Sequence, residues 1–327
     1  MRLRNSVLLF SAVTLAACGG GGGGAELTPT PPSASAPLAI TTANGQSATY
    51  AAWESANGSA GLSDLLSNSG FVSTGQLKPS IAPTTDLVNV VNKIPFGPTT
   101  LPCQVSGSIT VSGDLADPIT PTLTEGDVIN VDADNCDDGL GEVLDGQLGF
   151  SVDTFEGELL SGLYNLTMSM TMTDLSVTSA GETLTSSGDA TVMLNTLSAP
   201  SVSAQVSGSS LTTQTGAITE TLSNFLSAQS VDAGQTPAPY TLSSAGGLDS
   251  SRLSGSVEFS TPVTFSGFDN GYPQTGELLV TGASSSARLI ALDAVNVRVE
   301  IDSDGDGTVD DVIDTTWAEL TGETQSD

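Results

Sequence analysis

The chain has 327 residues, and its 37 Asp and Glu against 7 Lys and Arg give a net charge of -30. Such a chain is a poor nucleic-acid binder, because phosphate binding needs clustered lysine and arginine. It contains no histidine, which excludes Ser-His-Asp and Cys-His catalysis as well as imidazole metal ligands. Hydrophobic residues make up 38% of the chain, enough to predict a folded domain rather than a disordered polyelectrolyte.

The N-terminus has the pattern of an export signal. Arg2 and Arg4 precede an apolar run at residues 6–15, which is too short to cross a bilayer because crossing takes about 20 apolar residues. Leu15-Ala16-Ala17-Cys18 then resembles the lipobox of bacterial lipoproteins. The resemblance implies export, acylation of Cys18 and a membrane anchor. Because Gly19 rather than Asp follows the cysteine, it also implies the outer membrane, on either its periplasmic or its cell-surface face.

The composition of the chain divides it into four segments. A glycine run and a Pro/Ser/Thr-rich stretch follow Cys18, and this composition is typical of an extended tether. The predicted segments are a signal peptide at 1–17, a tether at 18–37, a mixed segment with short helices at 38–100, and a β domain with a C-terminal calcium loop at 101–327.

Two short helices are predicted in the mixed segment. Leucines at helical spacing indicate one at 61–66. Residues 85–94 have a helical apolar pattern with Pro95 as a stop signal, although the valines in this run leave a strand possible.

From about Cys103 onward, apolar and polar residues alternate, which predicts strands with one face on a core and one in water. No long amphipathic helices lie between the runs, so the pattern favours antiparallel over parallel pairing. Several runs exceed the usual strand length of about 5–6 residues, and long one-sided strands must curl, split or close. The predicted fold is mainly β, a sandwich, barrel or half-barrel with one or two short N-terminal helices. The clearest runs are 103–111, 144–152, 166–173, 190–194, 253–265 and 295–301.

Two cysteines remain besides Cys18. In the oxidising compartment that the lipobox implies, Cys103 and Cys136 are expected to form a disulfide. A loop of this size contributes about 3–4 kcal/mol on the loop-entropy model.

An acidic loop near the C-terminus carries the clearest chemical pattern. Asp302, Asp304 and Asp306 followed by Gly307 form a D-x-D-x-D-G motif, which resembles the calcium loops of EF-hands, dockerins and thrombospondin type 3 repeats. Ca²⁺ takes six to eight oxygen ligands, and a tight loop directs alternate side chains toward one centre.

The resemblance also implies the remaining calcium ligands. Thr308 would offer its backbone carbonyl, and Asp310 would bind directly or through water. Ile313 occupies the position of the usual bidentate Glu, so either Asp311 or Asp314 replaces it or a ligand from elsewhere in the chain completes the shell.

The residues that flank the loop differ from those of an EF-hand. A strand is predicted at 295–301, and 314–320 has the pattern of a strand or short turn rather than a helix. This favours a structural calcium site flanked by strands over a helix–loop–helix sensor.

Two other features allow two interpretations each. Met168, Met170 and Met172 line one face of a predicted strand, either as core or as an adaptable ligand groove. The second acidic cluster is interpreted as a solvated loop beside Cys136, or as a weaker cation site. It comprises Asp132, Asp134, Asp137 and Asp138.

The sequence predicts a location and an ion more clearly than an activity. No nucleophile-elbow or phosphate-loop motif is present, so a non-enzymatic role is expected. The first hypothesis is a calcium-stabilised structural or binding module of the envelope, whose partners are the membrane and an unidentified protein or small ligand. The alternatives are a carrier of an apolar ligand in an open half-barrel and a calcium-dependent hydrolase that uses carboxylates.

Overall fold

A computed structural model describes residues 35–61, 98–114, 124–137, 139, 141–158 and 162–322. The predicted lipobox lies outside these residues. So do the two helices predicted at 61–66 and 85–94, apart from Gly61 itself.

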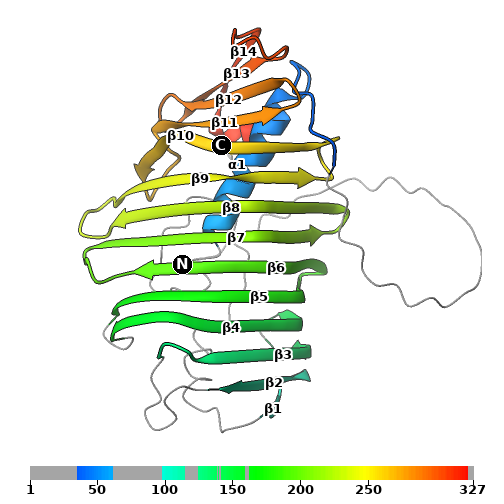
Figure 1. The fold of residues 1–327 in the computed structure, drawn as a ribbon, viewed down its shortest axis with the longest axis vertical. Coiled ribbons are helices and arrows are strands. Elements are labelled where there is room, and N and C mark those ends of the chain that lie inside the picture. Colours follow the sequence, from blue (N-terminus) through cyan, green and yellow to red (C-terminus); the bar gives the residue numbers. More distant parts are fainter. Residues whose placement is uncertain are drawn as a thin grey trace, which may run out of the picture. The chain divides into compact units, whose positions relative to one another are not determined.

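The strands of the described residues form one antiparallel sheet in which each strand pairs with the next along the chain (Figure 1). The predicted mainly-β antiparallel fold is confirmed. Within the described residues, the sheet is not closed into a barrel, because the first and last strands are its two edges. The strands are β1 Thr99–Pro102, β2 Ser106–Asp114, β3 Val128–Asp137, β4 Glu142–Glu158, β5 Leu163–Ser179, β6 Glu182–Asn195, β7 Ser201–Thr215, β8 Ile218–Asp232, β9 Pro239–Ser250, β10 Ser256–Phe268, β11 Thr275–Gly282, β12 Ser285–Ala291, β13 Asn296–Asp302 and β14 Asp311–Thr316.

Short hairpin turns account for this sequential order. Ala180 and Gly181 alone join β5 to β6, and both have positive φ angles, 53° and 87°, as a type I′ turn requires. Two residues also join β7 to β8 and β11 to β12. Such connections leave the chain no room for a crossover, so neighbouring strands are antiparallel.

One face of the sheet is apolar and buried. The register aligns Val152, Met168, Val192 and Val206 in a single row across β4 to β7, and all four are buried. Met170 and Met172 are buried on the same strand as Met168 and belong to the core, so the interpretation of the methionine stripe as core is supported. The opposite face carries cross-strand hydroxyl pairs, such as Ser230 and Thr241 with 2.8 Å between their oxygens.

The predicted N-terminal helix is present in the mixed segment, although its bounds were not predicted: α1 (Gly45–Gly61) packs on the buried face against strands β7 to β13. Figure 1 shows it lying obliquely across these strands. Trp53 is the largest buried side chain of α1. The centroid of its ring lies 4.7 Å from that of Phe265 and 5.0 Å from that of Trp317. The remaining buried side chains of α1 are mostly alanines, which favour a helix but give only a weak apolar period.

The C-terminal segment corrects one expectation. Residues 314–320 were expected to form a strand or short turn, but β14 ends at Thr316 and a one-turn helix, α3 (Trp317–Leu320), follows. Its N-terminus is closed by a capping box, in which the Thr316 side chain accepts from the Glu319 amide and the Glu319 side chain accepts from the Thr316 amide. Burial of Trp317 and Leu320 provides the packing that holds this single turn.

Bulges interrupt the long strands at polar residues. Asn135, Asp174 and Asn224 have positive φ angles of 46°, 48° and 45°, and each lies at a register shift of its strand. Asn and Asp tolerate this left-handed conformation better than other side chains. Bulges bend a strand locally, so these positions let long strands follow a twisted sheet.

None of the helices in the described residues has the length and apolar character needed to span a membrane.

Candidate metal centre

The acidic loop predicted from the sequence connects the last two strands of the sheet. Asp302 is the final residue of β13, and Asp310 immediately precedes β14. The base of the loop is closed by the Asp310 amide, which donates to the carbonyl of Ile301 at 2.8 Å. The antiparallel pairing of β13 with β14 therefore brings the two ends of the loop together.

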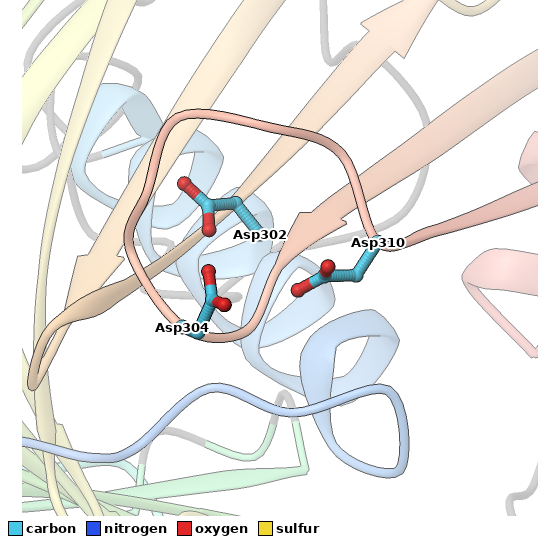
Figure 2. A group of neighbouring side chains, drawn as sticks. All are labelled: Asp302, Asp304 and Asp310. Atoms are coloured by element: carbon cyan, nitrogen blue, oxygen red, sulfur yellow. The ribbon is translucent and has the colours of Figure 1, made fainter.

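Three carboxylates of the loop converge. Asp302, Asp304 and Asp310 each place an oxygen atom within 4.8 Å of the others, and Figure 2 shows the side chains directed into the loop. Ca²⁺ binds oxygens at about 2.3–2.6 Å, so two of its ligands lie at most about 5 Å apart. The spacing of the three carboxylates is therefore compatible with one shared cation. We call Asp302, Asp304 and Asp310 the acidic triad.

Backbone amides hold the loop in shape. The two carboxylate oxygens of Asp302 accept hydrogen bonds from the amides of Gly305 and Gly307, at 2.7 and 3.0 Å. Both glycines have positive φ angles, 74° and 85°, which residues with a side chain rarely adopt. The motif predicted the turn at Gly307, whereas the need for a second glycine at Gly305 was missed.

Ser303 orients the last member of the acidic triad. Its amide and its hydroxyl both donate to the same carboxylate oxygen of Asp310. These hydrogen bonds lower the pKa of the Asp310 carboxyl, so it is held in the charged form. The sequence analysis missed Ser303, because a serine between two aspartates in a turn has no distinctive spacing.

The other predicted ligands have partners outside the acidic triad. Asp306 accepts from the Thr308 amide at 2.7 Å, and Asp311 accepts from the Val312 amide at 3.0 Å. Asp314 forms an ion pair with Arg298, whose guanidinium lowers the pKa of the Asp314 carboxyl. The structure thus brings together three of the predicted side-chain ligands and separates the remaining ones.

The charge of the acidic triad is poorly compensated. Asp302 is half-buried, whereas Asp304 and Asp310 are exposed. Two like charges about 4 Å apart repel by about 1 kcal/mol in water, and by more where solvent is partly excluded. Each arginine of the described residues already has an acidic partner. The pairs are Arg252 with Glu54 and Glu220, Arg288 with Glu277, and Arg298 with Asp314.

The second acidic cluster lies elsewhere and is built differently. Asp132, Asp134 and Asp137 lie on β3 rather than in a loop, and Asp138 lies outside the described residues. Within the part of the chain that the structure describes, the acidic triad is the one group whose carboxylates converge closely enough to share an ion.

The predicted disulfide is present. Cys103 and Cys136 are bonded, with their Cα atoms 5.5 Å apart. The bond ties the segment between β1 and β2 to β3, close to the edge of the sheet opposite the acidic loop.

Comparisons of this chain with protein-family models, with curated proteins and with solved structures give no match, so its function is argued from its own residues and geometry.

Proposed function

We propose that this chain is an exported, lipid-anchored lipoprotein of the outer membrane, whose β sheet is a structural or binding module stabilised by one calcium ion. The observation that carries the calcium part is the convergence of the Asp302, Asp304 and Asp310 carboxylates. A cation between them would join the end of β13 to the start of β14, so its effect falls on the last strands of the sheet.

Calcium is favoured over other metals by the donor set. The loop offers carboxylate and backbone oxygens, whereas zinc and copper sites use cysteine or histidine, and this chain has no histidine. Mg²⁺ requires near-ideal octahedral geometry and gives up its water reluctantly. A loop whose three carboxylates are exposed or half-buried suits the more permissive coordination of Ca²⁺.

The anchoring part of the proposal rests on the lipobox Leu15-Ala16-Ala17-Cys18. The Cys103–Cys136 disulfide supports export, because disulfides persist in oxidising compartments. Radiolabelled palmitate should label the expressed protein and should not label Cys18→Ser. An unlabelled protein, or a labelled Cys18→Ser variant, would contradict anchoring at this residue.

The calcium proposal predicts a rise in thermal stability when the ion is bound. Unfolding of the purified protein should occur at a higher Tm in about 2 mM Ca²⁺ than in excess EDTA, because a ligand that binds only the folded state stabilises it. Mg²⁺ at the same concentration should have a smaller effect. Equal Tm values with Ca²⁺ and EDTA would overturn the proposal.

Two matched variants identify the ligands. Asp310→Asn should abolish the Ca²⁺-dependent shift in Tm, because it removes a charge from the acidic triad. Asp306→Asn removes the same charge from a residue outside the acidic triad and should retain most of the shift. The reverse result would show that Asp306, as the D-x-D-x-D-G motif implies, is the ligand instead.

A further inference from the structure

The first described residues of the chain pack against the start of β10 and the turn between β11 and β12, more than 200 residues further along the sequence. We call Ser35–Ile40 the N-terminal strap. The Leu38 amide donates to the Ser256 carbonyl at 2.8 Å, and the Leu38 carbonyl accepts from the Ala283 amide at 2.7 Å. The Ile40 amide donates to the Ser285 hydroxyl at 2.8 Å. Leu38 and Ile40 are buried, so the N-terminal strap is part of the core.

Close packing against glycines fixes the position of the N-terminal strap. A Cβ atom on Gly282 would lie 2.1 Å from the carbonyl oxygen of Leu38, and one on Gly255 would lie 2.5 Å from that of Ala36. Both contacts are with backbone atoms, which cannot rotate away as the end of a flexible side chain can. A side chain at Gly282 would therefore displace the N-terminal strap.

The acidic loop packs against the same turn of the sheet. Ala283 and Ser284 connect β11 to β12, and a Cβ atom on Gly305 would lie 2.6 Å from the Ser284 carbonyl oxygen. The N-terminal strap contacts the residues on both sides of Ser284, namely Ala283 and Ser285. The turn from Ala283 to Ser285 thus separates the N-terminal strap from the acidic loop and contacts both.

A second contact leads from the acidic loop to α1. A Cβ atom on Gly45, the first residue of α1, would lie 2.6 Å from the Ile301 side chain. Ile301 immediately precedes Asp302, and its carbonyl closes the base of the loop. The residue that precedes the acidic triad is therefore packed against the start of α1, while the turn at 283–285 lies between the acidic loop and the N-terminal strap.

We propose that the acidic loop and the N-terminal strap are coupled through the turn at 283–285, so that cation binding strengthens docking of the N-terminal strap. The proposal rests on the calcium site proposed above and adds a role for it. Because the N-terminal strap is the point where the predicted tether joins the fold, the ion would control how firmly the anchored end of the chain is held. Coupling between two sites is reciprocal, so loss of docking must also weaken cation binding.

Hydrogen exchange measures the docking directly. In the full mature protein, exchange of the Leu38 and Ile40 amides should slow several-fold when Ca²⁺ is added, while amides of the distant strand β5 should change little. The same amides should show no response to Ca²⁺ in Asp310→Asn. Slowing of all amides to the same extent would indicate global stabilisation alone and would overturn the coupling.

Three variants test the reciprocal effect by Ca²⁺ titration. Gly282→Ala should speed exchange in the N-terminal strap and weaken Ca²⁺ binding several-fold, although it lies outside the acidic triad. Ser285→Ala removes the acceptor of the Ile40 amide and the hydroxyl that donates to the Ala283 carbonyl, without adding bulk. It should have the same effects to a smaller extent, and it serves as the test if Gly282→Ala does not fold. Gly271→Ala is the matched control, because a Cβ atom there meets nothing within 4 Å.

The outcomes separate the two proposals. Ca²⁺ binding that leaves exchange in the N-terminal strap unchanged, with equal affinity in wild type and Ser285→Ala, would overturn the coupling and retain the calcium site. Absence of Ca²⁺ binding to the wild-type protein would overturn the calcium site and the coupling with it.

Discussion

At the scale of single residues, aspartates organise the turns of this sheet through their hydrogen bonds to the backbone. Asp293 is the clearest case, because one of its carboxylate oxygens accepts from the amides of Val295 and Asn296, both at 2.7 Å. Hydrogen bonds from the Asn296 side chain, together with these bonds from the backbone amides, lower the pKa of the Asp293 carboxyl. The charged form therefore stabilises the turn between β12 and β13.

This arrangement predicts a dependence of stability on pH. Because the folded-state pKa of Asp293 is lowered, its stabilisation is present above the unfolded-state pKa of about 4 and is lost as pH falls through the folded-state value. Asp293→Ala should therefore lower Tm at pH 7, and its Tm difference from wild type should shrink below about pH 4. Tm measured from pH 7 down to pH 3 checks this, and a constant difference would contradict it.

At the scale of elements, both buried aromatic contacts and ion pairs hold α1 against the sheet. Trp53 is 5% exposed and contacts Phe265 and Trp317, which come from β10 and α3. Arg252 adds ion pairs from the turn after β9 to Glu54 of α1 and Glu220 of β8. These ion pairs are partly exposed to water, whereas the Trp53 ring is buried against two aromatic rings, so the aromatic contacts are expected to dominate.

Removal of the Trp53 ring tests this ranking. Trp53→Ala should lower the free energy of unfolding by about 3–5 kcal/mol, the range for truncation of a buried aromatic side chain. Met193→Ala, at a position 42% exposed, should change it by less than about 0.5 kcal/mol and serves as the control. Urea unfolding of both variants gives the comparison, and similar losses would show that α1 is not anchored by Trp53.

At the scale of the whole molecule, the two edges of the sheet are secured differently. The β14 edge carries the acidic loop and α3, whereas the β1 edge is tied to β3 by the Cys103–Cys136 disulfide. The bonded cysteines are 33 residues apart in sequence. A cross-link of this span restricts the unfolded chain and so favours folding.

Reduction of this bond should lower stability. On the loop-entropy model, the Cys103→Ala/Cys136→Ala variant should lose about 3–4 kcal/mol in free energy of unfolding. Urea unfolding with and without reductant checks the prediction. Reductant should shift the midpoint of the wild-type protein and leave that of the variant unchanged, and equal midpoints for wild type and variant would contradict a stabilising role.

The predictions from sequence succeeded where the pattern is local. Alternation along residues 166–173 predicted β5, because successive side chains of a strand point to opposite faces. Alternation was less informative for β3, where Asn135 interrupts it at a bulge. A short N-terminal helix was predicted, but the position of α1 was not, because alanines carry little hydrophobic signal. The helix α3 was missed although Thr316 and Glu319 have the spacing of a capping box.

In the candidate site, too, local spacing predicted some features and strand pairing decided others. The D-x-D-x-D-G motif predicted a turn that gathers carboxylates, and Asp302 and Asp304 do converge. The resemblance also predicted Asp310 as a ligand, and the pairing of β13 with β14 brings it to the other two. It further predicted Asp306, which lies outside the acidic triad. Likewise, the ion pair of Asp314 with Arg298 depends on the register of those two strands, in which the two residues are direct partners.

By itself, the sequence determined the antiparallel β class, the acidic loop and the disulfide partners, since these follow from periodicity, spacing and cysteine count. Only the tertiary structure decided that the sheet is open, that α1 packs on its apolar face, and that the N-terminal strap docks beside the acidic loop. The hydrogen bond from Ile40 to Ser285 joins residues 245 positions apart. Contacts of that kind depend on which surfaces fit when the whole chain folds, and no local pattern of residues encodes them.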